Sequence, residues 1–541
     1  MPDRSSPALN LPPALPRLSD YVAWYGERTP ETEAMTLGSE RVTYAQFQDQ
    51  IDQLAKALLA VGVKKGDRVA TLSTPSPDYF LAFLAASSIG AIWVGLNPRY
   101  QLEELAYVTG DSEPCVLLAR SQIEARNYAA ELEALNTRTA SIRHVVVFER
   151  DSSVLPDFTE AFTDFLARGE AVSDAQLEAA RAQCGGRDAC MIVYTSGSTG
   201  KPKGALLHHE GVIAFSLGQN EVWPISPMRA LNYFPINHIG CVVDLSAPTL
   251  IAGGTIVFLE QFEPRRSLEL MQEEKITLWG SVPSVFQLQF ADPEFTTFDL
   301  SAVQMIMWGG AAMPRELIEK LLNYGVPLAT NYGLTESGSA ITVITPTRNA
   351  DALESTVGVP FPGTEIRLID QTGVEVAQGE SGEILARSKY NMLGYWRRPD
   401  ASKEALSEDG WLHTGDIARQ NPDGTYSIVG RVKEMYKSGG YNVYPREVET
   451  AIEEHSKVDM AAVVSVSDAV WQEVGVAYVL ASAPLGVDDL MAHCRTRLAN
   501  YKLPKLFILV DELPLLPIGK VDKVELKKRA ENDYQPERTT Q

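Results

Sequence analysis

Apolar runs alternate with amphipathic stretches along most of this chain of 541 residues, and that alternation limits the folds open to it. Residues 68–72, 144–148 and 254–258 have the length of buried strands, whereas 44–61 and 102–109 carry apolar side chains at helical spacing. Strands and helices that alternate in this way pack as layers. The sequence therefore predicts an α/β fold, and its 45% of apolar residues can form a large core in two or three structural units.

The pattern changes toward the C-terminus. From 358 to 430, short extended pieces are separated by glycines, which is typical of a small β-rich subdomain. Beyond it, helical periodicity at 447–455 and two strand-like apolar runs indicate a compact α/β unit. We therefore predict an N-terminal domain, residues 1–430, that includes the β-rich subdomain 358–430, and a small C-terminal domain, residues 431–541.

Charge and cysteine spacing exclude several classes of protein. A formal net charge of −22 repels phosphates, so no nucleic-acid partner is expected. The five cysteines show no paired or metal-ligand spacing, and the N-terminus lacks the apolar core of a secretory signal, which together predict a cytoplasmic protein. The most apolar stretch, 80–96, is short for a membrane span and contains polar residues. We predict a buried helix followed by a strand there, and no transmembrane segment.

Small hydroxyl residues, glycines and two lysines follow an apolar strand in the segment YTSGSTGKPKG, residues 194–204. Glycines let backbone N–H groups approach phosphate oxygens, and hydroxyls and ammonium groups supply further donors. The segment is not a Walker A loop, because Lys201 is followed by Pro202 rather than by Ser or Thr. It predicts a loop that binds the phosphates of a nucleotide.

Further segments follow this loop in series: NYGLTESG at 331–338, WLHTGD at 411–416, GRVKEMYKSGGYNVYPREVE at 430–449 and PLLPIGK at 514–520. With them, nearly the whole chain resembles the adenylate-forming superfamily of acyl-CoA synthetases, peptide-synthetase adenylation domains and beetle luciferases. Within this superfamily, the chain resembles the fatty-acid or 4-coumarate-CoA ligases. The resemblance implies an enzyme that uses ATP and Mg²⁺ to convert a carboxylic acid into an acyl-adenylate and then passes the acyl group to coenzyme A.

Matched position by position, the resemblance also implies a nucleotide site. Its residues would be Thr195, Ser196, Gly197, Ser198, Thr199, Gly200, Lys203, Gly310, Ala311, Asn331, Tyr332, Gly333, Thr335, Asp416 and Arg431. The Tyr332 ring suits a purine, and the Glu336 carboxylate suits Mg²⁺. Asp416 can accept hydrogen bonds from ribose hydroxyls, and Arg431 can donate to ribose or phosphate. An Asp416–Arg431 ion pair is the structural alternative, and it can coexist with nucleotide binding.

Lys520 is the expected catalytic ammonium of the first half-reaction, where it would neutralise charge on the α-phosphate and the attacking carboxylate. By resemblance, the C-terminal domain then rotates about a hinge at Lys433. The face that replaces Lys520 and admits coenzyme A would contain Lys437, Ser438, Gly439 and Gly440. Glu434 and Lys523 stand where many relatives have Asp and Arg, and neither is expected to touch the chemistry.

The acyl pocket is predicted to contain His238, Gly240, Gly309 and Gly310. His238 resembles a histidine that lies beside the acyl group and gates the thioester tunnel, and the three glycines would leave a roomy, apolar space. By resemblance, the position at which peptide-synthetase adenylation domains usually hold an amino group with an aspartate falls near Asn237 or His238, and no aspartate occupies it. We therefore expect a hydrophobic acid, either a medium- or long-chain fatty acid or a bulky aryl, alicyclic or steroid-like acid.

Several alternatives remain open from the sequence. An acyl-AMP ligase that loads a carrier protein would carry the same motifs, and the resemblance also covers luciferase-like oxygenases. From another class, a non-catalytic ATP-binding scaffold is disfavoured because every position needed for chemistry holds a competent residue. A homodimer is compatible with the sequence.

Overall fold

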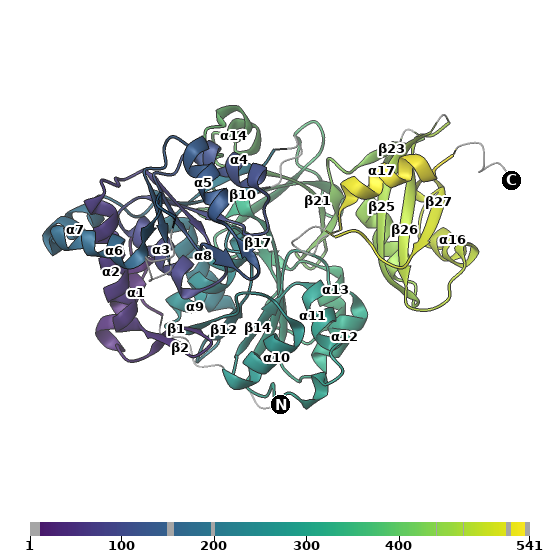
Figure 1. Ribbon diagram of the computed structural model, residues 1–541. Helices are drawn as coiled ribbons and strands as arrows, with labels where there is room; N and C mark the ends of the chain where they lie inside the picture. Colours follow the sequence, from purple (N-terminus) through teal and green to yellow (C-terminus); the bar gives the residue numbers. More distant parts are fainter. Residues whose placement is uncertain are drawn as a thin grey trace.

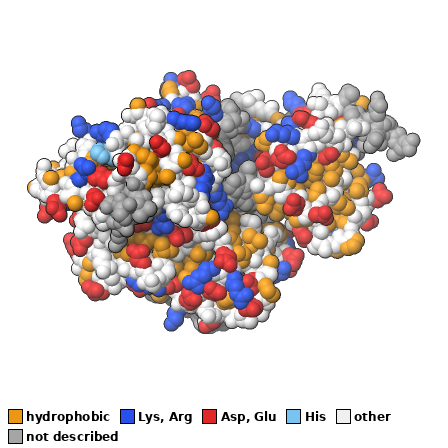
Figure 2. Space-filling view, in the orientation of Figure 1, with side chains coloured by type: hydrophobic (Ala, Val, Ile, Leu, Met, Phe, Trp, Pro, Cys, Tyr) orange, Lys and Arg blue, Asp and Glu red, His pale blue; other side chains and the backbone are white. Residues whose placement is uncertain are grey.

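The computed structural model describes residues 11–148, 156–195, 201–439, 441–468, 470–515 and 521–535, without the side chain of Asn442. These residues form a large body, drawn in purple to green, and a smaller yellow-green C-terminal lobe beside it (Figure 1). The predicted α/β fold with a large N-terminal and a small C-terminal domain is confirmed. Figure 2 shows Lys and Arg side chains on the large body beside its junction with the lobe.

Two mainly parallel sheets form the centre of the large body. The first has the order β11 (Lys203–His208), β10 (Ala189–Thr195), β4 (Ile92–Leu96), β3 (Arg68–Leu72), β5 (Val116–Ala119), β8 (His144–Val147) and β9 (Glu160–Ala161). The second has the order β18 (Val359–Pro360), β17 (Ser339–Val343), β16 (Leu328–Leu334), β15 (Met305–Trp308), β14 (Leu278–Ser281), β12 (Arg229–Asn232), β13 (Thr255–Phe258), β1 (Glu33–Leu37) and β2 (Glu40–Thr43). The antiparallel pairs lie at the edges, at β10–β11, β1–β2 and β16–β17–β18.

Two smaller sheets follow along the chain. An antiparallel sheet contains β19 (Glu365–Ile369), β20 (Ser381–Arg387), β21 (Leu412–Gln420) and β22 (Tyr426–Arg431). The C-terminal lobe contains β23 (Tyr436–Ser438), β24 (Tyr441–Val443), β25 (Val458–Asp468), β26 (Gln472–Ala481) and β27 (Leu506–Val510). A short hairpin joins β6 (Gln122–Ile123) to β7 (Arg126–Asn127). In the ribbon view β21 lies next to the lobe, so the third sheet borders the junction (Figure 1).

Helices cover the faces of these sheets. In the large body they are α1 (Ser19–Arg28), α2 (Tyr44–Ala60), α3 (Pro77–Ser88), α4 (Leu102–Ser112), α5 (Ala129–Arg138), α6 (Phe162–Ala167), α7 (Asp174–Arg181), α8 (His209–Val222), α9 (Ala247–Ile251), α10 (Pro264–Glu273), α11 (Pro283–Phe290), α12 (Arg315–Leu322), α13 (Ala350–Ser355) and α14 (Pro399–Ala405). In the lobe they are α15 (Pro445–Glu453), α16 (Val487–Arg495) and α17 (Lys523–Asp533). A π-helical turn, η3 (Gly240–Ser246), precedes α9, and a short 3₁₀ turn, η5 (Thr335–Ser337), joins β16 to β17.

Local sequence explains the elements that were predicted. Helix α2 begins at a capping box, in which Thr43 and Gln46 satisfy each other's backbone N–H groups, and its apolar face is fully buried. The apolar stretch 80–96 forms α3 and β4, as predicted, and nearly every side chain in both is buried. Within the described part of the chain, no helix combines the length and apolarity that crossing a bilayer requires.

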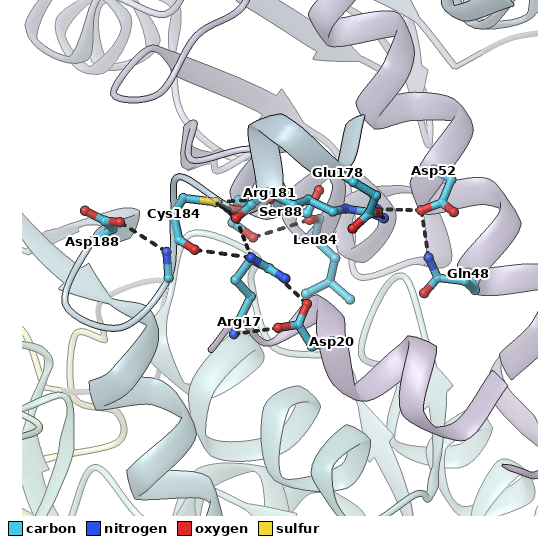
Figure 3. A network of polar contacts seen from close by, with 12 residues as sticks. Arg17, Asp20, Gln48, Asp52, Leu84, Ser88, Glu178, Arg181, Cys184 and Asp188 are labelled. Atoms are coloured by element: carbon cyan, nitrogen blue, oxygen red, sulfur yellow. Dashed lines mark hydrogen bonds and ion pairs between the residues drawn. The ribbon is translucent and has the colours of Figure 1, made fainter. Parts of the chain in front are cut away.

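Polar contacts fasten the segment before α1 to the body (Figure 3). The Arg17 guanidinium donates to the Asp20 carboxylate at 2.9 Å and to the backbone carbonyls of Arg181 and Cys184. Arg181 in turn pairs with Asp52 of α2 at 2.5 Å. Because the Arg17 guanidinium satisfies carbonyls at and just after the C-terminal end of α7, the segment before α1 is part of the fold.

Candidate active site

The hairpin β10–β11 positions the first predicted phosphate-binding residues. Its register sets Thr195 opposite Lys203, so the chain leaves and re-enters the sheet at the same place. Gly204 follows, and a Cβ there would lie 2.5 Å from the Ile192 side chain, which explains why a glycine stands at this position. Of the predicted loop residues, Ser196, Gly197, Ser198, Thr199 and Gly200 lie outside the described residues.

The Glu336 carboxylate lies directly beside this hairpin. Its Oε1 accepts a hydrogen bond from the Thr195 hydroxyl at 3.1 Å and another from the Tyr395 hydroxyl at 2.8 Å. The Lys203 ammonium lies 4.4 Å from the centroid of the Tyr395 ring. Burial and the neighbouring carboxylate raise the pKa of Tyr395, so its phenol stays protonated and continues to donate. The fold thus brings Thr195, Lys203 and Glu336 together.

Tyr395 was not among the predicted site residues. It lies in a segment that runs alongside β11, where the Leu206 N–H donates to the Gly394 carbonyl at 3.0 Å. The same segment holds η5, because the Met392 N–H donates to the Glu336 carbonyl at 2.9 Å. The signal in the sequence was an adjacent Tyr and Trp after a glycine in a polar stretch, which was not enough to assign a function.

The loop after β15 and the strand β16 form the next part of the site. A Cβ on Gly309 would lie 3.0 Å from Oδ1 of Asn331, so these two predicted residues are neighbours. Gly310 has a φ of +80°, which favours glycine, and Ala311 beside it is exposed. In β16, Gly333 faces the backbone of Ser339 so closely that a side chain has no room. Thr335 follows at the start of η5.

Three predicted residues meet on the third sheet. The Tyr332 hydroxyl donates to Oδ2 of Asp416 at 2.7 Å, and Nε of Arg431 lies 2.8 Å from Oδ1. Asp416 is only 3% exposed, and burial raises its pKa although Arg431 opposes the change. For Arg431, burial acts to lower the pKa, but the Asp416 and Glu434 carboxylates outweigh it and raise the pKa. The ion pair named as the structural alternative is therefore present, and both Asp416 oxygens already have partners.

The predicted hinge and coenzyme A residues lie around the junction. Lys433 is exposed in the turn between β22 and β23. Lys437 and Ser438 lie on β23, and Gly439, with a φ of +58°, begins the turn to β24. Gly440 and the predicted catalytic Lys520 lie outside the described residues.

The predicted acyl residues His238 and Gly240 adjoin the π-helical turn η3. Nδ1 of His238 accepts a hydrogen bond from the Gly240 N–H at 3.1 Å, so the neutral ring carries its proton on Nε2. A Cβ on Gly240 would lie 3.0 Å from this nitrogen and 3.8 Å from Oδ2 of Asp244. The Asp244 carboxylate also accepts a hydrogen bond from the Ser339 hydroxyl. An ionisable side chain therefore borders a space that was predicted to be apolar.

The predicted adenine and acyl residues are linked by neighbouring residues. Gly309 lies beside Asn331 of β16, Ser339 lies beside Gly333 of the same strand, and the Ser339 hydroxyl donates to Asp244, which lies beside Gly240. The large body brings the Thr195 hydroxyl and the Lys203 ammonium close to the Glu336 carboxylate, and a small C-terminal lobe follows it in the chain. This is the architecture of an adenylate-forming enzyme. The model of the AMP-binding enzyme family matches residues 22–396, and that of the AMP-binding enzyme C-terminal domain matches residues 447–520. The chain belongs to this family of AMP-binding enzymes.

Individual relatives cover almost the whole chain. It is 34% identical over 507 residues to feruloyl-CoA synthase of an Amycolatopsis species, covering 93% of this chain and 96% of that one. It is 31% identical over 519 residues to the long-chain-fatty-acid–CoA ligase FadD13 of Mycobacterium tuberculosis, covering 95% and 96%. The crystal structure of ATP-bound MatB from Rhodopseudomonas palustris has a TM-score of 0.82 at 27% identity and covers 96% of this chain and 100% of that one. The predicted class, an ATP-dependent, AMP-forming acyl-CoA ligase, is thereby confirmed.

Proposed function

We propose that this enzyme activates a hydrophobic carboxylic acid with ATP, releasing pyrophosphate, and then transfers the acyl group from acyl-AMP to coenzyme A, releasing AMP. The observation that carries this proposal is that Thr195, the last residue of β10, and Lys203, the first residue of β11, converge with Glu336. Hydroxyl and ammonium donors there suit phosphate oxygens. The Glu336 carboxylate beside Thr195 supplies an oxygen ligand for a divalent cation on those phosphates.

The donors at this place fit Mg²⁺. Glu336 offers a carboxylate that two hydroxyls hold in position, and Mg²⁺ favours a few carboxylate oxygens together with phosphate oxygens and water. When bound, the ion would neutralise negative charge on the triphosphate. Thr195 and Tyr395 would position this ligand, because their hydrogen bonds fix the direction of the Glu336 carboxylate.

The remaining nucleotide contacts are assigned on the same grounds. We assign Asp416 to the ribose hydroxyls, with Arg431 as a further donor to the ribose or a phosphate. Both Asp416 oxygens are engaged by Tyr332 and Arg431, so this assignment requires the carboxylate to add ribose hydrogen bonds to those it has, or Arg431 to turn toward the nucleotide. We assign Gly309, Gly310, Ala311 and Asn331 to the adenine and acyl sides of the same space.

Lys520 and the hinge belong to the proposal as well. We assign the Lys520 ammonium to the adenylation step, in which it stabilises charge on the α-phosphate, and Lys433 to the hinge that removes it. The face Lys437–Gly440 then receives coenzyme A. The exposure of Lys433 in a turn between two sheets, and the glycine turn beside Lys437, support this division of labour.

The decisive experiment is a screen of carboxylic acids with ATP, Mg²⁺ and coenzyme A, read as pyrophosphate release and by mass spectrometry of thioesters. Relatives named for ferulate and for long-chain fatty acids support a panel of aryl, alicyclic and fatty acids. We expect pyrophosphate and an acyl-CoA with at least one acid. Pyrophosphate and acyl-AMP without thioester would instead support transfer to a carrier protein, and silence across the panel would refute the ligase assignment.

A further inference from the structure

Helix α4 contacts the chain on both sides of the connection between β10 and β11. In the last turn of the helix, Oδ2 of Asp111 accepts a hydrogen bond from the Tyr194 hydroxyl of β10 at 2.8 Å. One turn earlier, the Tyr107 hydroxyl donates to the Pro202 carbonyl, directly before β11, at 2.8 Å. Tyr107 and Asp111 are four residues apart in the helix, so they lie on the same face. This one face therefore holds both ends of the connection.

The residues held in this way are the neighbours of the two proposed phosphate donors. Thr195 follows Tyr194, Lys203 follows Pro202, and Thr195 and Lys203 are paired across the hairpin. Burial and the Asp111 carboxylate raise the pKa of Tyr194, so its phenol stays protonated and continues to donate. The positions of the two donors are therefore set by α4 as well as by the pairing of the strands.

Asp111 also binds the segment that orients Glu336. Its second oxygen, Oδ1, lies 2.5 Å from Nη2 of Arg398, and its backbone carbonyl accepts a hydrogen bond from the Trp396 indole at 3.1 Å. Both partners lie within three positions of Tyr395, whose hydroxyl donates to the Glu336 carboxylate. The Asp111 side chain is 10% exposed, and hydrogen bonds to a charged group are stronger where water is largely excluded. Asp111 therefore connects β10 to the segment that holds the Glu336 carboxylate.

We propose that Tyr107 and Asp111 of α4 are positioning residues for ATP, which fix the Thr195 hydroxyl and the Lys203 ammonium relative to the Glu336 carboxylate. The inference rests on the proposed function and extends it to a helix outside the motifs that indicated the nucleotide site. Neither side chain needs to touch ATP, because both act through the residues next to the donors. Donors that are held in place before the ligand arrives bind it more tightly, since less conformational freedom is lost on binding.

Comparing ATP with AMP separates this role from a general loss of structure, because AMP lacks two of the three phosphate groups. Titration calorimetry without any acid gives the Kd of ATP with Mg²⁺ and the Kd of AMP. Asp111→Ala should raise the Kd of ATP about tenfold and that of AMP less than about twofold, because it removes hydrogen bonds to a charged group. Tyr107→Phe removes one neutral hydrogen bond and should raise the Kd of ATP about threefold, again with little effect on AMP.

Two further variants complete the comparison. Asp111→Asn keeps an acceptor oxygen for Tyr194 but loses the charge that pairs with Arg398, so its Kd for ATP should lie between those of the wild type and Asp111→Ala. It also serves if Asp111→Ala fails to fold. Glu103→Ala is the matched control, since it removes another carboxylate of α4, which pairs with Arg138 of α5 at 2.7 Å. It should leave both Kd values unchanged.

The two half-reactions give a second readout. With the most active acid of the screen, Asp111→Ala should show a higher KM for ATP in pyrophosphate release, while its thioester formation from supplied acyl-AMP stays within about twofold of the wild type. Equal weakening of ATP and AMP, or unchanged Kd values in Asp111→Ala and Tyr107→Phe, would overturn the inference alone. If the wild type binds ATP but releases no pyrophosphate with any acid, the proposed function fails while the Kd values still decide the inference. A wild type that does not bind ATP would overturn both.

Discussion

At the scale of single residues, the site depends on hydroxyls that hold carboxylates. Glu336 is held by Thr195 and Tyr395, and Asp416 by Tyr332. In each case a half-buried phenol with a raised pKa donates to an acid, so the donor keeps its proton at neutral pH. This gives each carboxylate a fixed direction before a ligand arrives, which is the condition for efficient electrostatic stabilisation.

Tyr395→Phe tests the support of Glu336. Removing one hydroxyl donor should lower kcat/KM for adenylation about tenfold and raise the Mg²⁺ concentration needed for half-maximal rate, since a hydrogen bond to a charged group contributes roughly 1.5–3 kcal/mol. Pyrophosphate release at several Mg²⁺ concentrations measures both effects. Tyr25→Phe, which removes a phenol bonded to the Ile251 carbonyl away from the site, is the matched control. An unchanged Mg²⁺ dependence would contradict the role given to Tyr395.

Asp244 predicts a pH-dependent stability. Its pKa rises from 3.8 to about 6 on folding, so the folded chain binds more protons than the unfolded chain between these values. Its stabilising contribution is complete below pH 3.8 and is lost as the pH rises through about 6. Relative to Asp244→Asn, the wild type should lose roughly 1 kcal/mol between pH 5 and pH 7.5. Thermal melts of both proteins at the two pH values measure this difference. Equal changes of melting temperature in the wild type and in Asp244→Asn would contradict a raised pKa for Asp244.

The residues of the short motifs could be predicted from the sequence, whereas the residues that form hydrogen bonds with them from distant segments could not. Thr195, Lys203 and Glu336 came from short motifs, because a phosphate loop needs particular side chains at close spacing. Tyr395 lies 59 residues from Glu336, to which it donates a hydrogen bond. Asp244 lies 95 residues from Ser339, from which it accepts one. Such pairs form only when strands distant in the chain become neighbours. The acyl pocket was predicted from the resemblance of His238 and from three glycines, and glycines indicate empty space without showing which side chains border it.

At the scale of elements, the segment at the start of α17, which follows Lys520 in the sequence, is tied to the start of the C-terminal lobe. Lys523, at the beginning of α17, pairs with Glu434 at 2.8 Å and with Glu449 of α15 at 2.7 Å. Glu449 is 3% exposed and also accepts the Val463 N–H at 2.9 Å. For Lys523, burial acts to lower the pKa, but the two carboxylates outweigh it and raise the pKa. The two departures from the family pattern, Glu434 and Lys523, are therefore partners of each other.

Lys523→Ala should disturb adenylation by removing one of the two cations beside the buried Glu449, which leaves only Arg446 at 3.5 Å. We expect kcat to fall about tenfold, with a lower melting temperature, because a buried carboxylate that loses a close partner is costly. Lys523→Arg keeps the cation and should restore kcat to within about twofold, which separates positioning of this segment from loss of a particular side chain. Pyrophosphate release and thermal melts give the two readouts. Full activity in Lys523→Ala would show that these ion pairs do not hold the segment.

At the scale of the whole molecule, two bodies meet at a short connection. The third sheet ends at Arg431 and the lobe begins with β23 at Tyr436, so the chain passes from one to the other in four residues (Figure 1). A short exposed turn between two separately packed sheets is where a rotation costs least. The proposed hinge at Lys433 lies in this turn.

Lys433→Pro and Lys520→Ala should damage opposite half-reactions. Proline fixes φ in the hinge, so thioester formation from supplied acyl-AMP should fall at least about tenfold while adenylation changes little. Lys520→Ala removes a preorganised charge, so adenylation should fall at least about a hundredfold while thioester formation from acyl-AMP is spared. Separate assays of the two half-reactions measure both variants. Equal losses in both assays would contradict the proposed division of labour.

Arg431 and Lys433 are separated by a single residue, Val432. Arg431 and Asp416 are opposite each other in the pairing of β22 with β21, on the N-terminal side of Lys433, so a rotation at Lys433 would leave their ion pair in place. The same rotation would move Glu434, which pairs with Lys523 of the lobe and also acts on Arg431. The number of carboxylates that compete with a bound nucleotide for this guanidinium would then differ between the two positions of the lobe.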